Sequence, residues 1–243
     1  NTSLQGKTFA HNWSPNGVLT DLKHWFGRMS TPTHFFNQAG FHPDGTVTHH
    51  KSDNASDVAL VAYGFEWMTS NTEAAKYYKN TPFEMNDEGL QFVSDRINYS
   101  YRRLIYKKSI DFLVTGRSFF SDLSNFGSKD IKNTIDNLIE AKNSSTIISN
   151  ESELLSLKSN LINGTHTHTE TTSFWNADYL MHRKESANDN YYFSVKNKSV
   201  RTSGAEDFDK IRKSWHAGSG PFLLRVTGDE YNPTIDKDAI NGT

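Results

Sequence analysis

The 243-residue sequence has no cysteine, and this absence excludes a disulfide framework and a thiolate zinc site. Neither sign of charge dominates, because 26 Lys and Arg residues stand against 28 Asp and Glu residues, and no block of like charge occurs. This balance argues against a protein that binds nucleic acid or an anionic membrane surface through its overall charge. Any polyanionic ligand must therefore be held by local basic residues.

Long apolar runs are absent as well. No stretch approaches the roughly 20 residues that cross a bilayer, and the residues after Asn1 lack a signal-peptide profile. The sequence begins without Met and stops at Thr243 soon after a strand-like region, so we expect a processed or excised part of a longer protein. Aromatic residues make up 13% of the chain, which suits a carbohydrate cleft, because sugars pack on flat apolar side chains.

Apolar residues recur at helical spacing in the first two thirds of the chain. The segments with this spacing are Val58 to Met68, Val93 to Phe112, Ile131 to Ile139 and Leu154 to Leu161. The polar stretch from Asn143 to Ser152 predicts a loop between the last two. The first part of the chain is therefore predicted to be helical.

After Asn163 and Gly164 the pattern changes to that of strands. Tyr191, Phe193 and Val195 alternate with polar residues, and a short apolar run from Phe222 to Val226 lies between Pro221 and Gly228. Helices followed by strands indicate an α+β fold and not an alternating doubly wound sheet. We divide the chain into a helical part, residues 1–164, and an antiparallel β part, residues 165–243.

Three clusters carry residues suited to chemistry. The first runs from Phe41 to His50, where a Pro-Asp-Gly turn precedes the adjacent His49 and His50 and a predicted helix containing Tyr63. The second is Arg117, which follows Gly116 after a long predicted helix. The third spans residues 174–220. Each also has an ordinary explanation as a turn, a surface histidine, a solvated arginine or a core tyrosine. The residue types alone leave the function open.

A metal site is the alternative for the histidines, since His49, His50, His166 and His168 offer imidazole ligands. Adjacent histidines point in different directions in most backbone conformations. No His-x-x-x-His pair on a helix supports zinc either, so we do not predict a metal ligand here.

In this order the clusters resemble the polysaccharide lyase family that contains chondroitin AC lyase, chondroitin ABC lyase and hyaluronate lyase. The similarity is best from Phe41 to His50 and is closest to the chondroitin ABC branch. It implies that His50 and Tyr63 match the catalytic histidine and tyrosine, although several extra residues separate them in this chain. Arg117, after Gly116, resembles the catalytic arginine of the family.

The β part continues the resemblance. The run from Phe174 to Asp178 is similar to the start of the central β domain of the family, and Glu206 to its active-site glutamate, although a surface role for Glu206 is nearly as well supported. We expect Trp175 to pack in the core, whereas Trp215 stacks on sugar or packs in the core. The resemblance assigns substrate binding to His49, Trp215 and, for the asparagine that neutralises the substrate carboxylate, Asn12.

The resemblance implies the end of an α/α toroid followed by the start of an antiparallel β-sandwich. It also implies a bacterial, secreted or periplasmic enzyme that cleaves chondroitin sulfate, dermatan sulfate or hyaluronan by β-elimination. The alternatives are a lyase for another uronate polymer, such as heparan, ulvan or xanthan, and a non-catalytic carbohydrate-binding protein. The expected partner is an acidic polysaccharide, with neither nucleic acid nor membrane involved. No cofactor is implied, and a structural calcium ion would be compatible with the chemistry.

Elimination needs a base for the C5 proton of the uronate, an acid for the departing C4 oxygen and groups that mask the neighbouring carboxylate. His50, with an ordinary pKa of about 6.5, suits proton abstraction at neutral pH. Neutral Tyr63 suits protonation of the leaving oxygen, and Arg117 would favour its phenolate when the tyrosine acts as the base.

Overall fold

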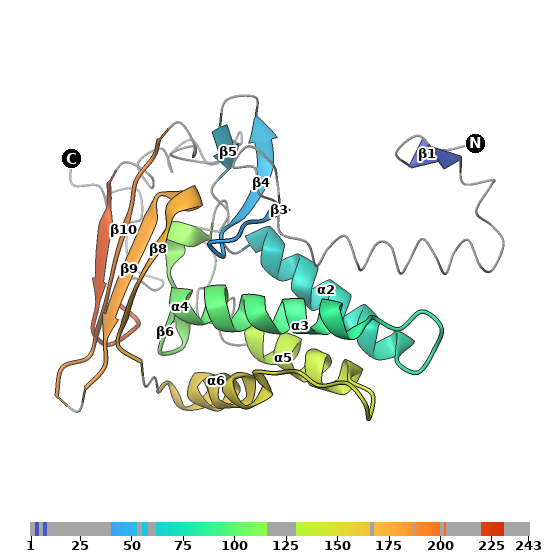
Figure 1. Ribbon diagram of the computed structural model, residues 1–243. Coiled ribbons are helices and arrows are strands. Elements are labelled where there is room, and N and C mark those ends of the chain that lie inside the picture. Colours follow the sequence, from blue (N-terminus) through green and yellow to red (C-terminus); the bar gives the residue numbers. More distant parts are fainter. Residues whose placement is uncertain are drawn as a thin grey trace.

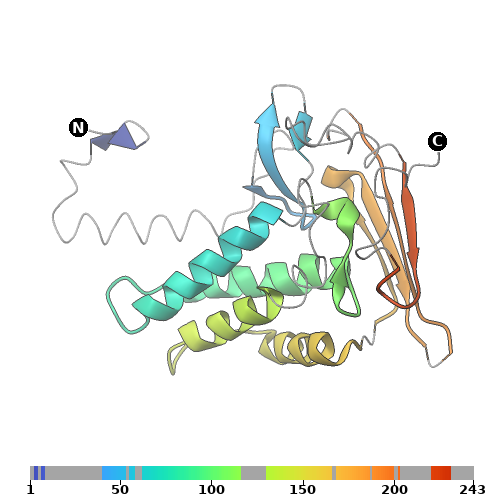
Figure 2. The same cartoon turned by 180° about the vertical axis from the view of Figure 1, so that it is seen from behind.

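The computed structural model describes residues 3–4, 7–8, 40–52, 55–57, 62–115, 130–165, 168–186, 188–199, 202 and 220–230. Figure 1 shows a group of helices on one side of the molecule and an antiparallel sheet beside them. The reverse view in Figure 2 shows the same arrangement, with the last strand of the sheet farthest from the helices. The helical part followed by an antiparallel sheet confirms the predicted fold class.

Five α-helices form the helical part in the described residues. They are α2 (Ala62–Tyr78), α3 (Asp87–Arg96), α4 (Arg102–Leu104), α5 (Asp130–Ala141) and α6 (Glu151–Asn163), with a π-helical turn, Ile97–Tyr101, between α3 and α4. Local signals set their ends. The Asn86 side chain caps α3 by accepting a 2.9 Å bond from the Gly89 amide, and Gly164 ends α6 in the left-handed conformation, which glycine adopts without strain.

The helical core lies where α2, α3, α5 and α6 meet. Its side chains are apolar and almost completely buried, and they repeat at the spacing that the sequence predicted. Met68, Val93, Ile97, Tyr101, Ile131, Ile135, Leu138, Leu154 and Leu157 are among them. Each of these helices therefore turns one apolar face toward the others.

Two of the four predicted helical segments are placed well, and two need correction. Helices α5 and α6 confirm the last two segments and the loop between them. Helix α2 begins only at Ala62 and runs on to Tyr78. The prediction of helix from Val93 to Phe112 is wrong beyond Leu104, because the chain turns into a hairpin at Lys107, whose φ is 55°. The hairpin residues are buried on both faces, so their apolar pattern cannot be told from that of a helix.

The main sheet has four antiparallel strands in the order β11-β10-β9-β8. They are β8 (Glu170–Phe174), β9 (Tyr179–Lys184), β10 (Tyr191–Lys196) and β11 (Phe222–Arg225). The smaller elements are β1 (Ser3–Leu4) with β2 (Lys7–Thr8), the three-stranded sheet of β3 (Gly40–Phe41), β4 (Val47–Ser52) and β5 (Ala55–Asp57), and the hairpin of β6 (Ile105–Tyr106) with β7 (Ser109–Ile110). The last helix before the main sheet ends at Asn163, close to the division that we placed at residue 164, which stays a prediction.

The alternation in β10 predicts the strand correctly, but the buried face is the opposite one. Tyr192, Ser194 and Lys196 are buried, whereas the apolar set that includes Phe193 is only half-buried. The inner face is polar because it receives Asp111, whose carboxylate accepts a bond from the Ser194 hydroxyl. In β10 the apolar alternation thus marks the less buried face of the strand.

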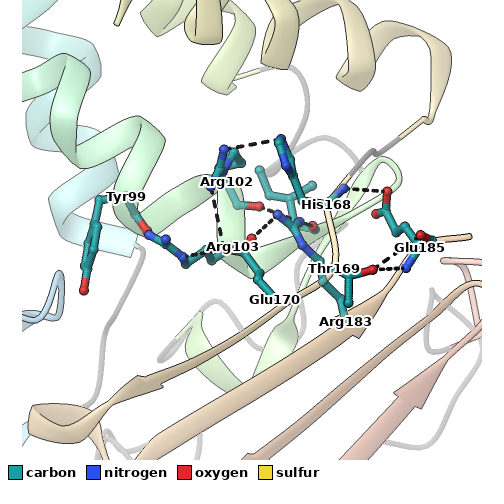
Figure 3. A network of polar contacts seen from close by, with 9 residues as sticks. Tyr99, Arg102, Arg103, His168, Thr169, Glu170, Arg183 and Glu185 are labelled. Atoms are coloured by element: carbon teal, nitrogen blue, oxygen red, sulfur yellow. Dashed lines mark hydrogen bonds and ion pairs between the residues drawn. The ribbon is translucent and has the colours of Figure 1, made fainter.

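A buried ion pair joins the sheet to the helices (Figure 3). Arg183 on β9 is fully buried and pairs with Glu170 on β8, whose other oxygen accepts a 2.9 Å bond from Nε of Arg103 on α4. Arg183 also donates to the carbonyl oxygen of Arg102 at 3.2 Å. Burial alone would raise the pKa of Glu170, but Arg183, Arg103 and Arg102 together lower it below its ordinary value.

Replacing Glu170 by Gln should lower the free energy of unfolding by about 3 kcal/mol at neutral pH, because Arg183 then keeps a buried charge without its carboxylate. The lowered pKa of Glu170 means that its contribution is complete above the ordinary glutamate pKa and is lost as the pH falls through the lowered value. Urea unfolding at a series of pH values measures both effects. In acid, the difference between the wild type and the variant should shrink.

The matched control is Asp189→Asn, because Asp189 pairs with Lys184 at the surface, where the side chains are 67% and 42% exposed. Such a pair adds little stability. Equal effects of the two variants at neutral pH would contradict the structural role of Glu170.

Candidate active site

The predicted Pro-Asp-Gly turn is present and leads directly into β4. The amide of Gly45 donates to the carbonyl oxygen of His42 at 3.0 Å, and the amide of His42 donates to the carbonyl oxygen of Thr46 at 2.8 Å. Gly45 has a φ of 84°, which favours glycine, and Asp44 accepts a 3.0 Å bond from the Thr46 amide. We call residues 42–46 the entry loop, because β4, with His49 and His50, follows it.

Asp44 ties the entry loop to the sheet part. Its carboxylate accepts from the backbone amide of Asn176 at 2.8 Å and from the Asn176 side chain at 3.2 Å. On the helical side, Arg96 donates to the carbonyl oxygen of His42 at 3.0 Å, and the imidazole of His42 lies 2.7 Å from the Thr48 hydroxyl. The entry loop is therefore bonded to both parts of the molecule, and this fixes the start of β4.

Gly64 lets β4 approach the first turn of α2. A Cβ at this position would lie 2.8 Å from a methyl carbon of Val47 and 2.6 Å from the hydroxyl of Tyr101. Tyr63 precedes Gly64 and is half-buried, and His50 lies three residues after Val47 on the same strand. The fold thus brings the strand of His50 to the helix end that carries Tyr63, as Figure 1 shows for β4 and α2.

The other predicted site residues lie outside the described part of the chain. These are Asn12, Arg117, Glu206 and Trp215. For His49 and His50 the structure describes the backbone in β4, where His49 is paired with Asp57 of β5. The roles assigned to these residues stay predictions.

The chain that leads to Arg117 is anchored on the sheet. Asp111 is fully buried and begins the 3-10 turn Phe112–Val114 by accepting a 2.9 Å bond from the Leu113 amide. Its second oxygen accepts from the hydroxyl of Tyr179 at 2.6 Å. Sequence reasoning gave Asp111 no role, although a carboxylate inside the run Ile110–Val114 was a signal that it meets donors from another segment.

The chain that leads to Glu206 has a similar anchor. Asp178 follows the 3-10 turn Trp175–Ala177 in the left-handed conformation, with a φ of 48°. Its carboxylate accepts from the hydroxyls of Ser199 at 2.5 Å and Thr202 at 2.6 Å. Thr202 lies four residues before Glu206 in the sequence. Asp178 therefore fixes the chain just before the predicted glutamate.

Burial shifts the pKa values of several groups on the inner face of the sheet in the direction that favours their neutral forms. It raises the pKa of Tyr179, with Asp111 adding to the effect, and it likewise raises the pKa of Tyr192. Burial lowers the pKa of Lys196 to about 7, and its ammonium donates to the carbonyl oxygen of Ala177 at 2.7 Å. Lys196 therefore carries less positive charge near neutral pH than an exposed lysine does.

The position of Trp175 differs from the prediction. Trp175, which we expected in the core, is 50% exposed, because the strand that precedes it ends with Phe174 buried and the chain then turns outward.

No cluster of histidine and acidic residues suited to a metal ion occurs within the described ranges. Of the four histidines considered for zinc, His168 contacts Arg102 at 3.4 Å, and His166 lies outside these ranges. No described helix is both long and apolar enough to span a membrane.

Comparisons with known sequences identify the family. Residues 20–155 match the N-terminal alpha-helical domain of polysaccharide lyase family 8, and residues 169–243 match its super-sandwich domain. The chain belongs to polysaccharide lyase family 8. The family assignment agrees with the resemblance inferred from the sequence, while the similarity to the chondroitin ABC branch stays a prediction.

Individual chondroitin lyases resemble this chain in sequence or in fold. Chondroitinase-AC of Pedobacter heparinus is 24% identical over 188 residues, which are 75% of this chain and 26% of the relative. A solved chondroitinase AC lyase has a TM-score of 0.72 at 21% identity, over 90% of this chain and 31% of that one. The chondroitin AC lyase of Streptomyces coelicolor has a TM-score of 0.66 at 15% identity, over 90% of this chain and 34% of that one.

A Paenibacillus xanthan lyase shares the fold as well, with a TM-score of 0.63 at 15% identity over 87% of this chain and 22% of that chain. The chain thus spans about a quarter to a third of the length of the family 8 proteins that it matches.

Replacing Gly64 by Ala should push β4 away from α2, since the added methyl group overlaps Val47 and Tyr101. We expect a loss of about 1–3 kcal/mol in the free energy of unfolding, as for other overpacked sites. Hydrogen exchange should also become faster at the amides of β4. Thermal unfolding and exchange followed by mass spectrometry measure the two effects.

Ser70→Ala serves as the control, because Ser70 lies on the exposed face of the same helix. Unchanged exchange in β4 of the Gly64→Ala variant would show that the close approach of strand and helix does not position β4.

Proposed function

We propose that the protein is the catalytic part of a lyase that cleaves uronic-acid-containing glycosaminoglycans by β-elimination and leaves an unsaturated uronate at the new end. Membership of polysaccharide lyase family 8 supports the reaction class. The observation that carries the proposal for this chain is the packing of β4 against the first turn of α2 at Val47 and Gly64. This packing brings together the elements of His50 and Tyr63, the proposed base and acid.

The chemistry explains why such residues are needed. The C5 proton of a uronate is weakly acidic, because its removal places negative charge beside an ionised carboxylate. Donors aimed at that charge, for which Asn12 and Arg117 are proposed, lower the barrier by stabilising the transition state. An imidazole at His50 then accepts the proton, and a phenol at Tyr63 donates to the departing C4 oxygen. Glu206 is proposed to orient a cationic partner at the site.

Chondroitin sulfate is the first substrate to test, since the Streptomyces coelicolor relative was solved in complex with it. Dermatan sulfate and hyaluronan follow from the same proposal. The similarity to a xanthan lyase supports a second candidate, a lyase for another uronate polymer. A non-catalytic carbohydrate-binding protein, the other alternative, would not need to bring His50, Tyr63 and Arg117 together.

Acidic polysaccharides of this kind occur outside bacterial cells, so we propose a secreted or periplasmic location for the enzyme. The expected partner is the polysaccharide itself. No cofactor enters the proposed steps, and calcium would have a structural role only.

Tyr63→Phe should abolish turnover and leave substrate binding nearly unchanged, because the variant lacks only the hydroxyl that exchanges the proton. The measurement is the ultraviolet absorbance of the unsaturated product with a panel of chondroitin sulfate, dermatan sulfate, hyaluronan, heparan sulfate and xanthan. Binding is measured separately by isothermal titration calorimetry with chondroitin sulfate.

Tyr78→Phe is the control, because Tyr78 lies at the opposite end of α2. Normal turnover by Tyr63→Phe would disprove the proposed role of Tyr63. A wild-type protein that releases no unsaturated product from any polymer of the panel would disprove the lyase function.

A further inference from the structure

Two exposed aromatic side chains lie beside the entry loop and have no part in the steps proposed above. Trp175 is 50% exposed in the turn after β8, and Tyr99 is 43% exposed in the π-helical turn after α3. Single exposed aromatic residues are common on proteins and need no function. These two differ because contacts to the entry loop fix each of them. The backbone next to Trp175 is bonded to Asp44, and the ring of Tyr99 packs on Gly45.

The turn of Trp175 is fixed through its neighbour. Asn176 is buried, and both its backbone amide and its side-chain amide donate to the carboxylate of Asp44. The turn is closed by a 3.4 Å bond from the amide of Asp178 to the carbonyl oxygen of Trp175. The indole is thus presented to solvent by a backbone that is bonded to the entry loop.

Tyr99 meets the next residue of the same loop. A Cβ on Gly45 would lie 2.7 Å from Cδ1 of Tyr99, so the glycine backbone packs directly on the phenol ring. The guanidinium of Arg103 lies 4.4 Å from the centre of the ring, and Glu170 holds that guanidinium with a 2.9 Å bond. Figure 3 shows Tyr99 beyond Arg103, on the side away from Glu170.

We propose that Trp175 and Tyr99 bind sugar rings of the polymer beside the entry loop, outside the linkage that is cleaved. The inference rests on the proposed function for the class of ligand, an acidic polysaccharide. Rings that are held in place before binding lose little conformational entropy when they pack on a sugar. Arg102, Arg103 and Arg183 share the single carboxylate of Glu170, so this group keeps positive charge beside Tyr99 for the carboxylate or sulfate groups of such a polymer. Trp175 is the main contact, because its indole offers the larger exposed surface.

The variants Trp175→Ala and Trp175→Phe test the proposal, with Tyr77→Ala as a matched control. Tyr77 is 70% exposed, but it lies 14 residues along α2 from Tyr63, about 21 Å away at the rise of an α-helix. The probe is a chondroitin sulfate hexasaccharide, titrated calorimetrically into variants that also carry Tyr63→Phe. Steady-state kinetics on the polymer are measured with Tyr63 intact, and thermal unfolding is measured for every variant.

We expect Trp175→Ala to raise the Kd for the hexasaccharide about tenfold, a typical loss for a central aromatic contact. The KM for the polymer should rise similarly while kcat stays unchanged, Trp175→Phe should restore most of the affinity, and Tyr77→Ala should have no effect. Tyr99→Ala should weaken binding in the same direction by a smaller factor.

Unchanged hexasaccharide binding by Trp175→Ala would overturn the inference. A lower Tm with unchanged binding would overturn it too, and would identify Trp175 as a packing residue. The absence of any binding by the parent protein would overturn it as well. A protein that binds the hexasaccharide through Trp175 but releases no unsaturated product would disprove the proposed lyase function and leave this inference standing.

Discussion

The carboxylate of Glu170 is the contact on which the arrangement of the two parts depends. It belongs to the sheet, yet it holds both the buried Arg183 of its own sheet and Arg103 of the helical part. A buried guanidinium without an anion costs several kcal/mol, so the sheet is stable beside these helices only where this pairing forms.

Three further acids extend this principle toward the candidate site, and of these Asp44 and Asp111 are buried whereas Asp178 is half-buried. Asp44 fixes the entry loop to the turn after β8, Asp111 fixes the approach to Arg117, and Asp178 fixes the approach to Glu206. Each accepts more than one bond, and such shared acceptors hold a loop more firmly than apolar contacts, because they restrict direction as well as distance. Rigid supports of this kind are what an active site assembled from several segments requires.

The outer face of the sheet differs in character. Phe222 is 65% exposed and Leu224 is 49% exposed. The half-buried Phe193 pairs with Leu224 and lies on the same surface of the sheet. An exposed apolar outer face is consistent with membership of a family whose β domain is a super-sandwich, where sheets pack on each other. Because this outer face is apolar, the apolar residues of the alternating pattern in β10 lie on it and not on the buried face.

The sequence by itself determined the change from a mainly helical part to a β part, α5 and α6 to within a few residues, the turn at Asp44 and Gly45, and the family. These depend on local spacing and turn chemistry, which a linear pattern records. Only the tertiary structure decided that Ile105 begins a hairpin and that Arg183 is buried, because an apolar run or a charged residue takes its meaning from the segment that packs on it. The approach of His50's strand to Tyr63 was likewise a tertiary matter, since it depends on the space left by Gly64 between Val47 and Tyr101.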